Sequence, residues 1–126
     1  MKFNHVTVVV ADFERSKRFY AALGLKQIVD SPPRYARFVA AEDGATFSIE
    51  AGAETGGAGA AHIYFECADL DARFDALAAD GFVFDHPPTD MPWLWREARL
   101  RDPDGRVVVL YWAGENRLNP PWRLTD

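Results

Sequence analysis

Cysteine is nearly absent from this sequence, in which Cys67 is the one cysteine among 126 residues. A single cysteine cannot form a disulfide within the chain, so the fold does not depend on an oxidising compartment. The sequence places no neighbouring base and no positively charged helix terminus beside Cys67. We therefore expect a buried, unreactive thiol rather than a nucleophile.

Long apolar runs are also missing. No stretch approaches the roughly 20 apolar residues that a transmembrane helix needs. The first residues enter a strand-like segment at Lys2-Phe3 and do not show the charged and then apolar pattern of a secretory signal. We expect a cytoplasmic protein that has no membrane partner.

The chain lacks an excess of positive charge, because its 14 Lys and Arg residues are outnumbered by 19 Asp and Glu residues and its net charge is −5. We therefore do not expect nucleic acid as a partner. Apolar residues, in contrast, make up 48% of the chain, and the aromatic residues among them are 9 Phe, 4 Trp and 4 Tyr. This composition suits one compact domain with a packed core and argues against disorder.

An internal repeat organises the chain. With an offset of 57 residues, the two halves align without a gap for about twenty residues. The aligned pairs at structural joints are His5 with His62, Asp12 with Asp69, and Gly24 with Gly81. In each half an apolar strand ends at the aspartate, which is a typical helix N-cap, and the helix that follows ends at the glycine.

The two helices are predicted from apolar residues at spacings of three and four. Their core-facing residues are expected to be Phe13, Ser16, Tyr20 and Leu23 in the first half, and Leu70, Phe74, Leu77 and Ala78 in the second. Three strands follow each helix, so that each half is a βαβββ module. The predicted strands are residues 25–29, 35–41 and 45–51, and then 82–84, 95–101 and 106–112.

Turn residues separate these strands. The predicted turns are Pro32-Pro33, Asp43-Gly44, Pro87-Pro88 and Asp102-Pro103-Asp104-Gly105. We predict a single α+β domain over residues 1–126, with a first module at about 2–52 and a second at about 61–113. A Gly-rich linker at 53–60 joins the modules, and a tail covers 114–126.

Two βαβββ modules, a histidine that opens each module, and the sequence Asp-Pro-Asp-Gly before the last strand resemble the vicinal oxygen chelate superfamily. This superfamily includes glyoxalases, bleomycin-resistance proteins and extradiol dioxygenases. The resemblance covers about residues 2–112. It implies that the modules form one cupped mixed sheet with the helices on the outer face, a small-molecule ligand in the cup, and a homodimer.

The resemblance also implies a metal site. Alternation along the strands places His5, Glu50 and His62 on the predicted cup face, and these residues match three of the family's ligand positions. Two histidines and one carboxylate suit a divalent metal such as Fe, Mn, Ni or Zn. The fourth ligand is usually a glutamate in the last strand, but Val109 stands there, or Tyr111 if the strand is shifted by two residues.

Two functions stay open on this evidence. With a metal, the protein is a lyase, isomerase or dioxygenase in which Glu50 and Tyr111 are the catalytic candidates. Without a metal or other cofactor, it is a binding protein of the bleomycin-resistance type that stacks a planar ligand on aromatic side chains. The candidate substrate-binding residues are Tyr64, Trp93, Trp95 and Val109. A purely structural subunit, whose cup is filled by side chains, is the third interpretation.

Overall fold

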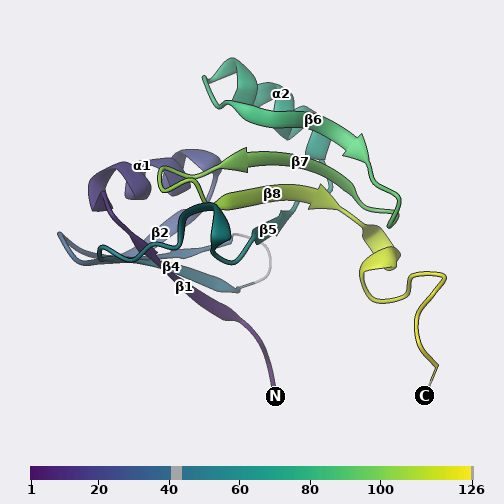
Figure 1. The fold of residues 1–126 in the computed structure, drawn as a ribbon, viewed down its shortest axis with the longest axis horizontal. Coiled ribbons are helices and arrows are strands. Elements are labelled where there is room, and N and C mark those ends of the chain that lie inside the picture. Colours follow the sequence, from purple (N-terminus) through teal and green to yellow (C-terminus); the bar gives the residue numbers. More distant parts are fainter. Residues whose placement is uncertain (41–43, 126) are drawn as a thin grey trace. The chain divides into compact units, whose positions relative to one another are not determined.

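The computed structural model describes residues 1–40 and 44–125. The chain divides into two units, of which the first is Met1–Ala60 with Asp102–Arg106 and the second is Ala61–Arg101 with Val107–Asp126. Each unit contains one main helix and one four-stranded sheet (Figure 1). No helix in the described part of the chain is long and apolar enough to cross a membrane.

The first unit has its strands in the order β1-β4-β3-β2. Its elements are β1 (His5–Val10), α1 (Phe13–Leu23), β2 (Lys26–Ser31), β3 (Tyr35–Val39), β4 (Thr46–Ala51) and the short 3₁₀ helix η1 (Gly57–Gly59). Strands β1 and β4 pair in parallel, while β3 pairs antiparallel with both β2 and β4. The sheet is therefore mixed, as predicted.

The second unit repeats this topology with the strand order β5-β8-β7-β6. Its elements are β5 (Ile63–Glu66), α2 (Leu70–Ala79), β6 (Phe84–Asp90), β7 (Arg96–Arg101), β8 (Val107–Trp112) and the 3₁₀ helix η2 (Gly114–Arg117). Again the outer strand β5 pairs in parallel with the strand that comes last in the repeat, β8. The predicted α+β fold of two βαβββ modules with mixed sheets is confirmed, and the joint cup stays a prediction.

Helix α1 follows the predicted pattern closely. The Asp12 side chain caps it by accepting a hydrogen bond of 3.1 Å from the Arg15 amide. The buried residues are the four that the spacing predicts: Phe13, Ser16, Tyr20 and Leu23. After Leu23 the chain turns at Gly24, whose φ of 125° is accessible at low cost only to glycine.

Helix α2 departs from its prediction at both ends of the buried face. Asp69 makes no capping hydrogen bond, and its carboxylate lies 3.5 Å from the Arg73 guanidinium instead. Leu70 and Leu77 are buried as expected, but Ala78 is exposed. The last turn therefore faces solvent one residue earlier than the periodicity indicates.

Strand β6 corrects the second proline turn. Residues Pro87-Pro88 were predicted to form a turn, but they lie inside β6. This is possible because β6 lies at the edge of its sheet. One side of an edge strand has no neighbouring strand, so a proline whose nitrogen faces that side costs no hydrogen bond between strands. Register shifts between Phe84 and His86 and between His86 and Thr89 accommodate the prolines. The Pro32-Pro33 turn is confirmed, whereas the predicted turn residue Asp43 and strand end Ala41 lie outside the described residues.

One face of the first sheet packs against α1. The Tyr20 ring lies 4.7 Å from the Phe47 ring and 6.4 Å from the Phe38 ring, measured between centroids. Val10 and Ile49, which point to the same side as these rings, are fully buried. The opposite face of the sheet carries the polar residues discussed below.

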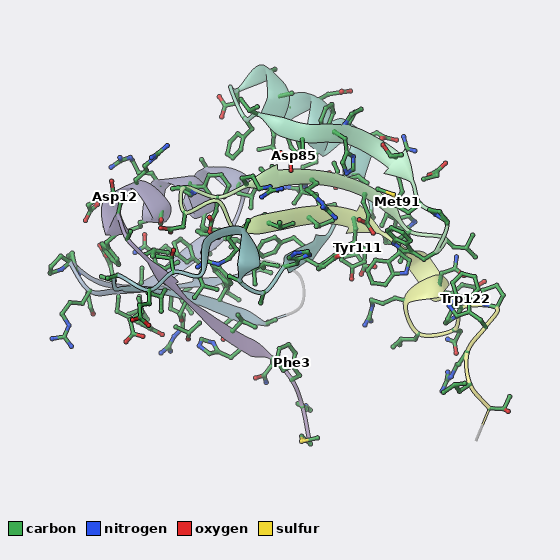
Figure 2. The ribbon with its side chains drawn as sticks, viewed as in Figure 1. Phe3, Asp12, Asp85, Met91, Tyr111 and Trp122 are labelled. Atoms are coloured by element: carbon green, nitrogen blue, oxygen red, sulfur yellow. The ribbon has the colours of Figure 1, made fainter. Side chains whose placement is uncertain are left out.

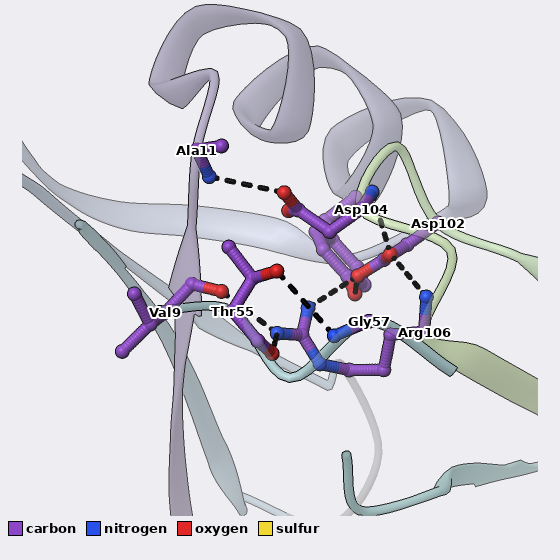
Figure 3. A network of polar contacts seen from close by, with 8 residues as sticks. Val9, Ala11, Thr55, Gly57, Asp102, Asp104 and Arg106 are labelled. Atoms are coloured by element: carbon purple, nitrogen blue, oxygen red, sulfur yellow. Dashed lines mark hydrogen bonds and ion pairs between the residues drawn. The ribbon is translucent and has the colours of Figure 1, made fainter. Parts of the chain in front are cut away.

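The turn between β7 and β8 belongs to the first unit, where Arg106 is 1% exposed. Its guanidinium donates to the Asp102 carboxylate over 2.5 Å, to the Val9 carbonyl over 2.7 Å and to the Thr55 carbonyl over 2.9 Å (Figure 3). All three partners are hydrogen-bond acceptors, and they come from three different segments of the first unit. The sequence analysis predicted the turn at this position but not the buried arginine.

Asp102 is the second centre of this network. It accepts the phenol hydrogen of Tyr20 over 2.6 Å and the amide hydrogens of Asp104 and Arg106, each over 2.9 Å. Burial and the charge of Asp102 both raise the pKa of Tyr20. The Asp-Pro-Asp-Gly motif thus provides a buried anion that pairs with one cation and one phenol, in addition to forming a turn.

Candidate functional site

Three aromatic rings gather on the second sheet, and we refer to Tyr64, Trp95 and Tyr111 as the aromatic cluster. The Trp95 and Tyr111 rings are stacked, with centroids 4.6 Å apart and planes inclined by 17°. Tyr64 meets both of them edge-on, at 5.9 Å from Trp95 and 5.6 Å from Tyr111. Offset stacks and edge-to-face contacts are the favoured geometries of aromatic pairs.

The strand register explains why these rings meet. Tyr64 in β5 pairs with Val109 in β8, two residues before Tyr111, so that the three side chains share one face. Tyr111 in turn pairs with Glu97 in β7, two residues after Trp95. The alternate residues of β8, Val108 and Leu110, occupy the other face and are buried.

The aromatic cluster rests on an apolar base. Val107, Val109, Tyr111 and Ala113 form a buried apolar group, and Trp95 packs against it. Tyr64 is 41% exposed and presents its ring to solvent. The predicted binding residues Tyr64, Trp95 and Val109 therefore lie together on one face.

Both tyrosines of the aromatic cluster are neutral at ordinary pH. Burial raises the pKa of Tyr64, and the negative charge of Glu97 raises it further. Burial also raises the pKa of Tyr111, with the charge of Glu66 adding to the effect. Tyr111 is thus suited to stacking and hydrogen bonding, and it is a poor general base.

The fourth predicted binding residue, Trp93, lies in the turn that leads into β7. The turn is closed by hydrogen bonds from the Met91 amide to the Trp95 carbonyl and from the Leu94 amide to the Met91 carbonyl. Met91 and Tyr111 lie toward the same end of the second sheet (Figure 2). The Trp93 indole donates to Glu97 Oε2 over 2.6 Å, which connects the turn to the face of the aromatic cluster.

Glu97 is a functional candidate that the sequence analysis missed. Its side chain is 1% exposed, and its second oxygen, Oε1, has no hydrogen-bond partner among the described residues. The Nε atom of Arg99, two residues further along the same face, is likewise buried and without a partner there. The available signal was alternation, since Glu97 and Arg99 in β7 follow Trp95, which directly precedes the strand, at steps of two residues and so share its face.

The first of the predicted metal ligands, His5, has both ring nitrogens engaged. Its Nδ1 lies 2.5 Å from the Thr46 hydroxyl oxygen and its Nε2 lies 3.0 Å from that of Thr7. Thr46 is also its partner in the strand register. In this arrangement His5 has no free nitrogen to offer to a metal.

Glu50, the second predicted ligand, lies at the other end of the same pair of strands. It pairs with Val9 in β1, four positions from the His5 and Thr46 pair, which corresponds to about 13 Å between the backbones. The first unit therefore does not bring Glu50 and His5 together, and these two residues do not fit a shared metal ion. In the part of the chain that the structure describes, no three His, Cys, Asp or Glu side chains form a group that could hold a metal.

The remaining predicted ligand, His62, is exposed and immediately precedes β5. The fourth ligand position of the family corresponds here to Val109, which is fully buried, or to Tyr111, which pairs in register with Glu66. Valine has no donor atom for a metal. The spacing of His5 and Glu50 along the strands does not fit the predicted three-ligand site, and a role of His62 in metal binding stays a prediction.

A small polar cluster on the first sheet was not predicted. The Tyr35 hydroxyl lies 2.6 Å from the hydroxyl of the fully buried Ser48 and accepts a hydrogen bond of 2.9 Å from Arg37 Nε. Burial would raise the pKa of Tyr35, but the hydrogen bonds with Ser48 and Arg37 outweigh it and the net shift is downward. The two sheets thus differ in character, one polar and one aromatic.

Comparison with solved structures supports this fold. A glyoxalase/bleomycin resistance protein/dioxygenase from Nocardioides has a TM-score of 0.77 at 22% identity, covering 99% of this chain and 90% of that chain. A member of the same superfamily from Sphaerobacter thermophilus has a TM-score of 0.71 at 25% identity, covering 89% and 97%. A protein of unknown function from Agrobacterium tumefaciens has a TM-score of 0.69 at 31% identity, covering 89% and 94%.

A search of curated proteins gives no match to this chain. The sequence pattern of the Glyoxalase/Bleomycin resistance protein/Dioxygenase superfamily, in contrast, matches residues 2–110. This match covers both βαβββ modules and confirms the resemblance that the repeat indicated. The chain belongs to the Glyoxalase/Bleomycin resistance protein/Dioxygenase superfamily.

Proposed function

We propose that this protein binds a planar aromatic small molecule on the aromatic cluster of its second unit, without the help of a metal. The observation that carries the proposal is the half-exposed ring of Tyr64 beside the stacked pair of Trp95 and Tyr111. An exposed aromatic ring beside a buried and a partly buried ring offers a flat ligand both stacking and edge-to-face contacts.

Two features of the residues at the family's metal-ligand positions support a site without a metal. His5 uses both ring nitrogens in hydrogen bonds within its own unit. In the last strand, the fully buried Val109 stands where the family supplies an acid. A relative of similar fold carries bleomycin resistance in its description, which fits a binding role as well as an enzymatic one. A cytoplasmic location and a homodimer stay predictions.

Calorimetric titration with quinoline, a flat aromatic probe, tests the proposal. We expect Tyr64→Ala to weaken quinoline binding by about 3- to 10-fold, which corresponds to the loss of one aromatic contact. Because Tyr64 is 41% exposed, its truncation should leave the fold intact.

Trp122→Ala is the matched control, since Trp122 is a 57% exposed aromatic residue in the tail. The Trp122→Ala variant should bind quinoline with the same affinity as the wild type. No detectable binding to the wild type, or equal losses in both variants, would rule the proposal out.

A further inference from the structure

The face of the aromatic cluster contains a buried carboxylate whose bonding is incomplete. Glu97 is 1% exposed. Its Oε2 atom accepts a hydrogen bond from the Trp93 indole, while its Oε1 atom has no partner among the described residues. A buried oxygen that lacks a donor is destabilising, because it has lost its water without gaining a hydrogen bond. A ligand with an N–H or O–H group at this point would remove that penalty.

A complementary donor belongs to the same face of the same strand. Arg99 Nε is buried and lacks a partner in the described chain. Arg99 follows Glu97 by two positions on one strand. Their side chains therefore leave the same face of the sheet, about 7 Å apart along the backbone. Arg99 pairs in register with Val109 and Glu97 pairs with Tyr111, so both residues lie on the face of the aromatic cluster.

The charges of this pair narrow the choice of ligand. A cation would be attracted by Glu97 but repelled by Arg99, and the reverse holds for an anion. A neutral group with one donor and one acceptor satisfies both atoms. The N–H and C=O of a cyclic amide fit this requirement, because in the cis arrangement of the ring they point the same way, as two side chains on one strand face do.

We propose that the ligand of this site is a planar lactam, in which an aromatic ring stacks on the aromatic cluster while its N–H donates to Glu97 Oε1 and its C=O accepts from Arg99 Nε. The inference rests on the proposed function, because it assumes that the aromatic cluster binds a flat molecule. Trp93, which is 45% exposed, donates its indole hydrogen to Glu97 Oε2 and so leaves Oε1 as the acceptor for the ligand.

Three flat bicyclic probes differ at the amide edge: 2-quinolone has both the N–H and the C=O, N-methyl-2-quinolone carries a methyl group in place of the donor hydrogen, and quinoline lacks both groups. Calorimetric titration of the wild type should give an affinity for 2-quinolone at least about 10-fold higher than for N-methyl-2-quinolone, as expected for one hydrogen bond to a charged group. This comparison needs no variant and so does not depend on how a substitution affects folding.

Glu97→Gln identifies the acceptor. The glutamine carbonyl can keep the Trp93 hydrogen bond, which leaves its NH₂ group, a donor, in the place of Oε1. We expect the preference for 2-quinolone over its N-methyl form to disappear. Asp85→Asn, which neutralises an exposed carboxylate of β6 that pairs with Arg101, should keep the preference.

The outcomes distinguish this inference from the proposed function. If the wild type binds all three probes equally, or if Glu97→Gln retains the preference, the lactam assignment is wrong and aromatic binding stands. If none of the three probes binds, the proposed function fails and the lactam assignment fails with it. A preference for 2-quinolone that Glu97→Gln alone abolishes is the result we expect.

Discussion

Trp95 and Tyr111 stack with their ring centroids 4.6 Å apart, and the stack joins the residue just before β7 to the last part of β8. Tyr64 closes the cluster from β5, at the position that the 57-residue repeat aligns with Thr7 of the first unit. Thr7 there bonds to His5. The two modules thus share one topology, but the corresponding sheet face is polar in the first module and aromatic in the second.

Tyr111→Leu should lower the free energy of unfolding by about 1–3 kcal/mol, since it removes two aromatic contacts that are each worth about 0.5–1.5 kcal/mol. Tyr111→Phe keeps both rings in place and should lie within about 0.5 kcal/mol of the wild type. Denaturant unfolding measures both values. Equal losses in the two variants would show that the stack does not contribute.

Arg106→Met tests the buried network of the β7–β8 turn. The substitution leaves the Asp102 carboxylate without its cation, and we expect a loss of about 3–5 kcal/mol in the free energy of unfolding. Arg101→Met is the control, because the ion pair of Arg101 with Asp85 is about 40% exposed on both sides. For such a pair a loss of about 1 kcal/mol or less is expected, so similar losses in the two variants would contradict the account.

Trp93→Phe removes the hydrogen bond to Glu97 and leaves both carboxylate oxygens without a partner among the described residues. The expected loss of stability is about 1–3 kcal/mol. Trp112→Phe, at a residue that is similarly exposed (43% against 45%), should cost no more than about 0.5 kcal/mol. Thermal unfolding of the two variants in parallel checks the difference, and a neutral Trp93→Phe variant would argue against the hydrogen bond.

One of the four tyrosines should ionise at a lower pH than the other three. The pKa of Tyr35 is lowered by its hydrogen bonds with Ser48 and Arg37, while burial raises the pKa of Tyr20, Tyr64 and Tyr111. Ultraviolet absorbance during alkaline titration should show one early step, and Tyr35→Phe should remove it. An early step that persists in Tyr35→Phe would contradict the assignment.

The same shifts predict how stability depends on pH. For a group whose pKa is higher in the folded than in the unfolded state, the stabilisation is complete below the unfolded value, about 10 for tyrosine. It is lost as the pH rises toward the folded value. Three of the four tyrosines shift in this direction, so stability should decline above about pH 10, with Tyr20 ionising last because it is buried beside Asp102.

Much of the fold could be predicted because it depends on local signals. Asp12, Gly24 and the spacing of Phe13 and Tyr20 define α1 whatever surrounds it. The prolines of β6 misled the prediction, because whether Pro87 and Pro88 are tolerated depends on the place of the strand in the sheet. An edge position is a tertiary property that the local sequence does not encode.

The site was predicted in part for the same reason. Tyr64, Trp95 and Val109 were named as binding candidates, and the register places them on one face. Strand alternation also assigned His5 and Glu50 to one face. It could not show that the pairing of β1 with β4 sets His5 opposite Thr46 and four positions from Glu50, because alternation gives the face of a residue and not its height along the sheet. Glu97 was missed because a charged residue in a strand is ordinarily exposed.

Metal content and ligand binding, measured on the same purified protein, test the central claim most directly. Elemental analysis should find no stoichiometric divalent metal, and the Kd for quinoline should be the same before and after treatment with a chelator. The contradicting result is a stoichiometric metal that both His5→Ala and Glu50→Ala abolish, together with loss of quinoline binding when the metal is removed.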